Sequence, residues 1–147
     1  MAVAFIGLGS NLGDRAQALR LALQKIGELP KTRVMKSSTF HETDPVGGPP
    51  QEKFLNAAAE LQTELQPLEL LRSLQKIEEE IGRPAAHERW GPRVIDLDLL
   101  DFDGLTLNRP GLELPHPRLH ERPFVLIPLA EIAPEWRHPH ADRPPTG

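Results

Sequence analysis

Two carboxylates, Asp96 and Asp98, lie within an apolar run that two arginines precede. The segment from 89 to 102 reads R-W-G-P-R-V-I-D-L-D-L-L-D-F. Because polar and apolar residues alternate with a period of two, it predicts a strand from which both aspartates leave one face, with Cα atoms about 6 to 7 Å apart. Two oxygen donors at that separation suit magnesium, and Arg89 and Arg93 supply the positive charge that a phosphate-bearing substrate needs. The segment therefore predicts a site for a metal and a triphosphate.

The same strand admits a purely structural interpretation. Half-buried strands alternate in this way, and Asp96 and Asp98 would then only be solvated on the outer face. Aspartate is a poor strand former, however, and local rules tend to be broken at functional sites. The two aspartates beside Arg, Trp and Gly residues therefore favour the functional interpretation.

The composition restricts the class of protein. With 147 residues, 39% of them hydrophobic and 26% charged, we expect one soluble globular domain over residues 1–147. A formal charge of -4 argues against broad binding of nucleic acid, which needs a basic surface. No apolar run approaches about 18 residues and no leader opens the chain, so we expect no membrane partner and a cytoplasmic location. The lack of cysteine excludes disulfides and thiolate metal sites.

The hydrophobic periodicity predicts the element order βαββαβ with short additions. Strands are expected at 2–8, 33–43, 54–62 and over the aspartate segment, and helices at 14–26 and 67–81. The later additions are a hairpin around 103–104, a strand at 112–114, a buried helix at 124–130 and a proline-rich tail at 137–147. This order is typical of an α+β fold, the ferredoxin-like two-layer sandwich, in which helices pack on an antiparallel sheet.

A glycine-rich segment, G-L-G-S-N-L-G-D at 7–14, follows the first strand. Its spacing is one residue away from the dinucleotide fingerprint, and no acidic residue follows a second strand in the expected place, which excludes a Rossmann domain. Two interpretations stay open, a tight turn between strand and helix or direct binding of phosphate. The turn is favoured, because glycine-rich turns are common.

Four segments in this order resemble one known family. They are G-L-G-S-N-L-G-D at 7–14, G-G-P-x-Q-x-x-F-L-N at 47–56, R-W-G-P-R-x-x-D-L-D at 89–98 and P-H-P-R-x-x-x-R-x-F-V-L-x-P-L at 115–129. The third is highly specific, and the match runs from residue 2 to about 135. Together the segments resemble the 6-hydroxymethyl-7,8-dihydropterin pyrophosphokinases of folate synthesis.

The resemblance implies that the terminal two phosphates of ATP pass to the pterin hydroxymethyl group and release AMP. It also implies two Mg²⁺ ions held by Asp96 and Asp98, with Arg83 and Arg93 as catalytic cations and the chain acting as a monomer. The residues that it implies for the pterin are Thr43, Pro45, Val46, Phe54, Asn56, Asp96 and Phe124. Those that it implies for ATP are Gln75, Glu78, Trp90, Arg93, Leu99, His116 and Arg122.

Two rival functions remain at this point. One is an ordinary magnesium-dependent kinase or nucleotidyl transferase on the same sandwich. Kinase action would release ADP, whereas pyrophosphoryl transfer releases AMP. The other is a binding module without catalysis, which the scarcity of aromatic residues and the negative charge disfavour for RNA. The long loops at 44–53 and 83–92 are expected to close over the substrates, because water must be excluded from an activated phosphoryl group. Phe54 stands where members of the family often carry Tyr, which keeps the stacking face and omits a hydroxyl.

Overall fold

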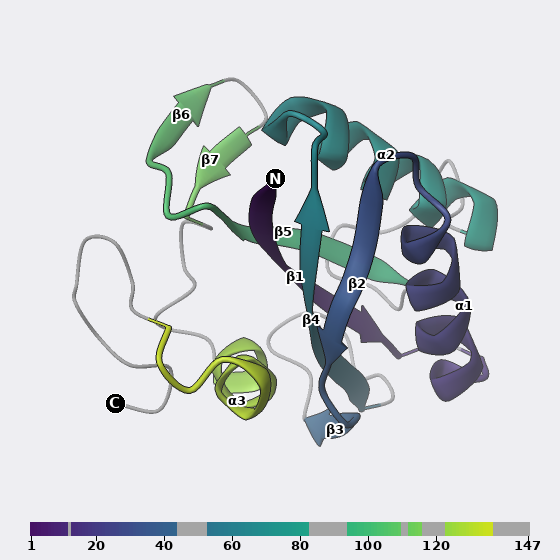
Figure 1. Ribbon diagram of the computed structural model, residues 1–147. Helices are drawn as coiled ribbons and strands as arrows, with labels where there is room; N and C mark the ends of the chain where they lie inside the picture. The colour runs from purple at the N-terminus through teal and green to yellow at the C-terminus, as the bar shows by residue number, and fades with distance from the viewer. Residues whose placement is uncertain (12, 44–52, 83–93, 110–111, 116–122, 137–147) are drawn as a thin grey trace.

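A five-stranded antiparallel sheet forms the centre of the molecule (Figure 1). The computed structural model describes residues 1–11, 13–43, 53–82, 94–109, 112–115 and 123–136. The strands are β1 (Ala2–Ser10), β2 (Thr32–Ser37), β3 (His41–Thr43), β4 (Phe54–Thr63) and β5 (Asp96–Phe102). They follow the order β2-β4-β1-β5, and β3 pairs with the start of β4. This antiparallel order confirms the expected ferredoxin-like arrangement.

Helices cover both faces of the sheet. The helices α1 (Arg15–Gly27) and α2 (Pro67–Ile81) lie side by side on one face, on the right in Figure 1. The helix α3 (Pro123–Ile132) packs on the opposite face, mainly against β4. Two short strands, β6 (Leu107–Arg109) and β7 (Leu112–Leu114), pair only with each other among the described residues, beside the end of β5.

The first two helices begin where the sequence supplies caps. The Asp14 carboxylate accepts a hydrogen bond from the Gln17 amide at 3.1 Å, so it caps α1. At α2, Pro67 takes the first helical position, and the Glu69 carboxylate accepts from the Gln66 amide at 2.9 Å. Both predicted helix starts are therefore confirmed, and Gly82, at φ 136°, ends α2 as predicted.

The main core lies between the sheet and the α1–α2 layer. Apolar side chains from alternate positions of the strands meet the apolar stripes of the two helices, and most are less than 6% exposed. Its fully buried large side chains are Ile6, Leu19, Ile26, Leu61, Leu70, Leu74, Ile95 and Leu114.

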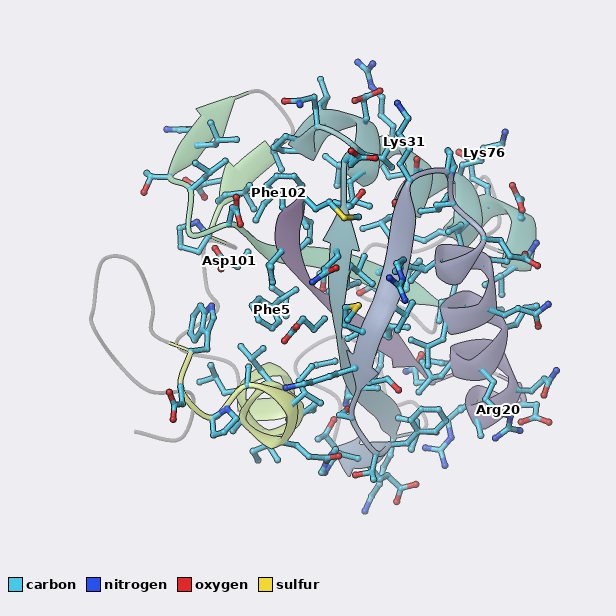
Figure 2. The ribbon with its side chains drawn as sticks, viewed as in Figure 1. Phe5, Arg20, Lys31, Lys76, Asp101 and Phe102 are labelled. Atoms are coloured by element: carbon cyan, nitrogen blue, oxygen red, sulfur yellow. The ribbon has the colours of Figure 1, made fainter. Side chains whose placement is uncertain are left out.

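A smaller core lies on the other face, under α3. It contains Phe5, Ala58 and Leu100 from the sheet and Leu129 and Ile132 from α3. Figure 2 shows Phe5 between the sheet and α3. Among the described residues, this core occupies only part of that face of the sheet.

A shift of register in β5 changes which side chains face α3. Ile6 pairs with Leu99 and Phe5 with Asp101, so Leu100 is an extra residue in the ladder. Leu99 points into the main core, and the extra residue leaves both Leu100 and Asp101 on the α3 side, the side of Phe5. Without the bulge, strict alternation would turn Asp101 toward the α1–α2 layer.

Several expected boundaries were wrong. β1 continues to Ser10, two residues beyond the expected strand at 2–8, so Gly9 lies in a central strand rather than in a turn. The expected strand at 33–43 is divided into β2 and β3 around Ser38. The Ser38 amide donates to the Ala58 carbonyl at 2.8 Å, but the Ala58 amide donates to the Ser38 hydroxyl at 2.9 Å. The turn at Asp103-Gly104 forms with both φ values positive, but the returning strand β6 pairs with β7 instead of β5.

Within the described residues, no helix combines the length and the apolar character needed to cross a membrane. α3 is longer than the expected helix at 124–130 by one residue at its start and two at its end. The expected tail at 137–147 lies outside the described residues.

Candidate functional site

Asp96 and Asp98 leave the face of β5 that lies opposite the main core. Both side chains are half-buried, whereas their neighbours Leu97 and Leu99 are 5% and 4% exposed within the main core. The alternation predicted from the sequence is therefore confirmed over residues 95–99. The register places Asp96 opposite Gly9 and Asp98 opposite Gly7 on β1.

The two glycines make the surface beside these carboxylates shallow. On the other side of β1, Gly9 pairs with Asn56 and Gly7 with Ala58, so each glycine lies between an aspartate of β5 and a residue of β4. A Cβ atom on Gly9 would lie 3.1 Å from Oδ1 of Asn56 and 3.6 Å from Cδ1 of Phe54. Glycine at this position therefore allows Asn56 and the Phe54 ring to approach the centre of the sheet.

Thr43, Phe54 and Asn56 form a cluster at the start of β4. Thr43 pairs with Phe54 across the β3–β4 ladder, and the Asn56 amide nitrogen donates to the Thr43 hydroxyl. Asn56 is 6% exposed, so its amide is held in a fixed orientation, while Phe54 is half-buried. Two strand spacings separate Asn56 from Asp96, which is about 10 Å between their Cα atoms. The structure thus brings together three of the residues predicted for the pterin and both predicted metal ligands.

Arg15 braces this cluster from the first turn of α1. Its guanidinium donates to the Lys53 carbonyl and to the Glu42 carboxylate, both at 2.8 Å. The hydrogen bond and then the charge of Arg15 lower the pKa of the Glu42 carboxyl. Glu42 lies in β3 shortly before the 44–52 segment, and Lys53 follows that segment directly before β4. The Arg15 side chain therefore holds the end of β3 and the start of β4 together.

A second brace connects α3 to the sheet. The Glu131 carboxylate accepts from the Thr39 amide and hydroxyl, both at 2.7 Å, and lies 2.8 Å from Nε2 of His41. The two hydrogen bonds from Thr39, followed by His41, lower the pKa of Glu131. His41 pairs with Asn56 in the β3–β4 register, so α3 is fixed beside the Thr43, Phe54 and Asn56 cluster.

The α2 side chains predicted to contact ATP differ in exposure. Gln75 is exposed, whereas Glu78 is 3% exposed and its Oε2 accepts from the Leu97 amide at 2.8 Å. Leu99 is buried in the main core, so only its backbone, on the edge strand β5, is available to a ligand. Gly82 and Val94 lie beside each other, since a Cβ atom on Gly82 would meet Val94 at 3.9 Å. α2 therefore ends where β5 begins, and Gln75 lies further along β5 than Glu78.

The donor set fits magnesium bound through a nucleotide. Magnesium is commonly held by one or two carboxylates together with substrate phosphates and water. Over the ranges that the structure describes, no group of three or more His, Asp or Glu side chains is arranged to enclose a metal. Asp96 and Asp98 provide two hard oxygen ligands on one face, which suits a metal that arrives with a triphosphate.

Other predicted site residues lie outside the described residues. They are Pro45, Val46, Arg83, Trp90, Arg93, His116 and Arg122. Phe124 is the second residue of α3. The two loops expected to close over the substrates fall almost entirely in the same gaps, at 44–52 and 83–93.

Some contributors to the site were missed in the sequence. Gly9 was assigned to a turn, although its two-residue spacing from Gly7 after an apolar run is compatible with one strand face. Glu131 and His41 carried no recognisable pattern, because their contact joins segments 90 residues apart.

Asp101 is a further buried carboxyl on the α3 side of β5. It is 4% exposed, and its Oδ2 accepts from the indole N–H of Trp136 at 3.2 Å. None of the described residues bonds to its Oδ1. Burial raises the pKa of Asp101, and the Trp136 hydrogen bond opposes that rise. Figure 2 shows Asp101 near the end of β5.

Comparison with known proteins agrees with this geometry. The profile of one family, 7,8-dihydro-6-hydroxymethylpterin-pyrophosphokinase (HPPK), matches residues 5–134. The 2-amino-4-hydroxy-6-hydroxymethyldihydropteridine pyrophosphokinase of Bacillus subtilis is 49% identical over 130 residues, which cover 88% of this chain and 77% of that protein. The protein of the same name from Methylorubrum extorquens is 46% identical over 135 residues, covering 92% and 85%.

Structural comparison supports the fold independently. A crystal structure of Plasmodium falciparum HPPK-DHPS with pteroate superposes with a TM-score of 0.76 at 16% sequence identity. The similarity covers 99% of this chain and 41% of that protein, so this chain spans about two fifths of its length. With its family profile, its close relatives and its fold in agreement, this chain belongs to the 7,8-dihydro-6-hydroxymethylpterin-pyrophosphokinase family.

Proposed function

We propose that this chain transfers the diphosphoryl group of ATP to the hydroxymethyl group of 6-hydroxymethyl-7,8-dihydropterin, with Asp96 and Asp98 as the metal ligands. The products are the pterin diphosphate and AMP, in folate biosynthesis. The observation that carries the proposal is the row Asp96, Gly9 and Asn56 across three neighbouring strands. It supports the proposal because the Asp96 carboxylate, proposed to bind metal, and the buried Asn56 amide, proposed to bind the pterin, lie on one face of the sheet, about 10 Å apart.

The pterin half of the site is the cluster of Thr43, Phe54 and Asn56. A flat heterocycle with amide-like edges needs an aromatic face and fixed hydrogen-bonding groups at its rim. The Asn56 amide nitrogen is engaged with Thr43, and its Oδ1 lies over Gly9, where it is available to accept a ring N–H. Phe54 provides one stacking face and Phe124, on α3, the other. Pro45 and Val46 offer backbone contacts, and Asp96 orients the hydroxymethyl end.

The ATP half lies along the edge of β5. Gln75 and the backbone of Leu99 are placed along this edge beyond the carboxylates, which suits the nucleoside. The side chains proposed to contact ATP are Gln75, Trp90, Arg93, His116 and Arg122, together with the Leu99 backbone. Their positive members supply the charge that a triphosphate needs. Glu78 is 3% exposed and contributes through the Leu97 amide rather than by contact with ATP.

Catalysis by these residues is mainly alignment and neutralisation of charge. Asp96 and Asp98 would hold two Mg²⁺ ions, which supply electrostatic stabilisation of the triphosphate and of the entering and leaving oxygens. Arg83 and Arg93 neutralise charge that develops on the transferred group and on the AMP oxygen, since guanidinium groups bind phosphate in a bidentate manner. Asn56 and Phe54 hold the pterin so that its hydroxyl oxygen is in line with the β-phosphorus.

Analysis of the nucleotide products tests the proposal. With 6-hydroxymethyl-7,8-dihydropterin, ATP and Mg²⁺, the protein should form AMP and pterin diphosphate in equal amounts. Asp98→Ala should form at least about 100-fold less, because several kcal/mol of charge stabilisation are lost. Formation of ADP instead of AMP would identify an ordinary kinase. Absence of turnover would favour the binding module without catalysis.

A further inference from the structure

Glu78 is a buried carboxylate that contacts the backbone between the two aspartates. Its side chain is 3% exposed, and its Oε2 lies 2.8 Å from the amide nitrogen of Leu97. Leu97 is the residue between Asp96 and Asp98. The contact joins α2 to β5 across 19 positions of the chain, in a part of the molecule where the two elements pack together.

The Glu78 carboxylate takes the place that a neighbouring strand would have on the outer side of β5. β5 is the last strand in the order β2-β4-β1-β5, so among the described residues only one of its edges has a strand partner. In an antiparallel ladder, the N–H and C=O groups of successive residues point alternately to the two edges. Because the Leu97 amide points outward to Glu78, the amides of Asp96 and Asp98 point inward to β1. Residues 96–98 are therefore held from both edges.

A carboxylate is a costly choice for this task. Removing a charged group from water costs several kcal/mol unless it is paired or hydrogen-bonded, and an apolar side chain would pack in the main core without that cost. A hydrogen bond from an amide to a carboxylate is about twice as strong as one between neutral groups. The buried Glu78 carboxylate therefore makes rigid the backbone segment 96–98, which carries both proposed metal ligands.

We propose that Glu78 is a positioning residue for the metal site, which it serves through the Leu97 backbone. This inference rests on the proposed function, because it takes Asp96 and Asp98 as the metal ligands. By fixing the Leu97 amide, Glu78 sets the separation and direction of the two carboxylates. Groups that orient metal ligands in this way typically change metal affinity by about 10- to 100-fold when they are removed.

Binding of Mn²⁺ with a non-hydrolysable ATP analogue, followed by the electron paramagnetic resonance of free Mn²⁺, tests the inference. Glu78→Gln and Glu78→Met both remove the charge and keep an unbranched side chain, but only Gln can accept from Leu97. We expect Met to bind Mn²⁺ at least tenfold more weakly than Gln. Equal affinities would overturn the inference. Glu79→Gln, an exposed neighbour on the same helix, is the matched control and should keep the wild-type affinity.

A second variant covers the case in which Glu78→Met does not fold. Glu78→Asp keeps the charge but is one methylene shorter, so its carboxylate is drawn away from the Leu97 amide. We expect about tenfold weaker binding of Mn²⁺ than in the wild type, and unchanged binding would overturn the inference.

Amide hydrogen exchange in the metal-free protein provides a readout that does not depend on the metal. Exchange at Leu97 should be slow in the wild type and in Glu78→Gln, and at least tenfold faster in a variant without the acceptor. Equal exchange would contradict the positioning role.

Asp98→Ala in the same Mn²⁺ titration distinguishes a failure of the proposed metal site from a failure of the role of Glu78. Wild-type affinity in Asp98→Ala would contradict the proposed metal site itself. Loss of binding in Asp98→Ala with equal affinities for the Gln and Met variants would overturn only the role of Glu78.

Discussion

The two faces of the sheet are built from different kinds of side chain. The face under α1 and α2 presents Ile6, Leu61, Leu97 and other large apolar side chains in a continuous layer. The face toward α3 presents glycine at 7 and 9, with aspartate and asparagine beside them. In the part of the chain that the structure describes, its buried apolar cluster is the smaller core around Phe5 and Leu129.

Because of this difference, neighbouring residues of one strand serve either the stability of the core or the candidate site. Because neighbouring residues of a strand point to opposite faces, Leu97 belongs to the core and Asp98 to the site. The same holds on β1 for Leu8 and Gly9. Substitutions one position apart should therefore have effects of different kinds.

The largest expected effects are the loss of activity in Asp98→Ala and the loss of stability in Leu97→Ala. Asp98→Ala should reduce activity by at least about 100-fold and leave the free energy of unfolding nearly unchanged, because it removes one of two like charges from one strand face. Asp96→Ala should behave in the same way. Leu97→Ala should lower the free energy of unfolding by about 2 to 5 kcal/mol, as deletions in well-packed cores do.

Steady-state kinetics and urea unfolding of the three variants check this comparison. An unfolded Asp96→Ala or Asp98→Ala protein would show that the face of these aspartates is also needed for the stability of the fold.

A smaller effect is expected from a methyl group on the shallow surface. Gly9→Ala would place its Cβ 3.1 Å from the Asn56 amide oxygen, closer than most real Cβ contacts, so that amide must shift by a few tenths of an ångström. We expect the KM for the pterin to rise about tenfold, with a stability loss of about 1 to 3 kcal/mol from overpacking. Gly27→Ala, where the added Cβ meets only Val34 at 3.8 Å, is the control and should leave both KM and stability nearly unchanged. An unaltered KM in Gly9→Ala would argue that the pterin binds elsewhere.

The smallest effect concerns the pH dependence of the smaller core. Burial raises the pKa of Asp101 above its usual value of 3.8, so its ionisation weakens the folded state as pH rises through the folded pKa. The Trp136 N–H opposes this by stabilising the ionised form. Trp136→Phe should therefore cost about 1 to 3 kcal/mol more at pH 7 than near pH 4, where the carboxyl is closer to neutral.

Denaturant unfolding at the two pH values measures this difference. In an Asp101→Asn background, the cost of Trp136→Phe should not depend on pH, because the titrating carboxyl is absent. A pH-independent cost in the wild-type background as well would contradict the role assigned to the hydrogen bond.

Local patterns were sufficient to predict the main elements and the strand face shared by Asp96 and Asp98. The helix starts at Asp14 and Pro67 depend on residues within one turn, and the alternation around Asp96 depends on the strand alone. The order of these elements indicated the ferredoxin-like sheet.

Features that depend on contacts between distant segments could not be predicted in this way. The Leu100 bulge becomes visible only when β5 is aligned with β1, and the β6–β7 pairing competes with the hairpin that Asp103-Gly104 suggests. Likewise, Glu78 differs from its exposed neighbour Glu79 only because α2 packs with one side on β5. The roles of the pterin and ATP residues came from the family resemblance rather than from their spacing.

Paramagnetic broadening of amide signals by Mn²⁺, in the presence of a non-hydrolysable ATP analogue, tests the central claim most directly. The broadening should centre on residues 96–98 of β5 and on Gly7 and Gly9 of β1, and spare the outer turns of α1. Asp98→Ala should abolish it. Broadening centred elsewhere, for example around Asp101 and Asp103 at the far end of β5, would contradict a metal and triphosphate site on the glycine-lined face.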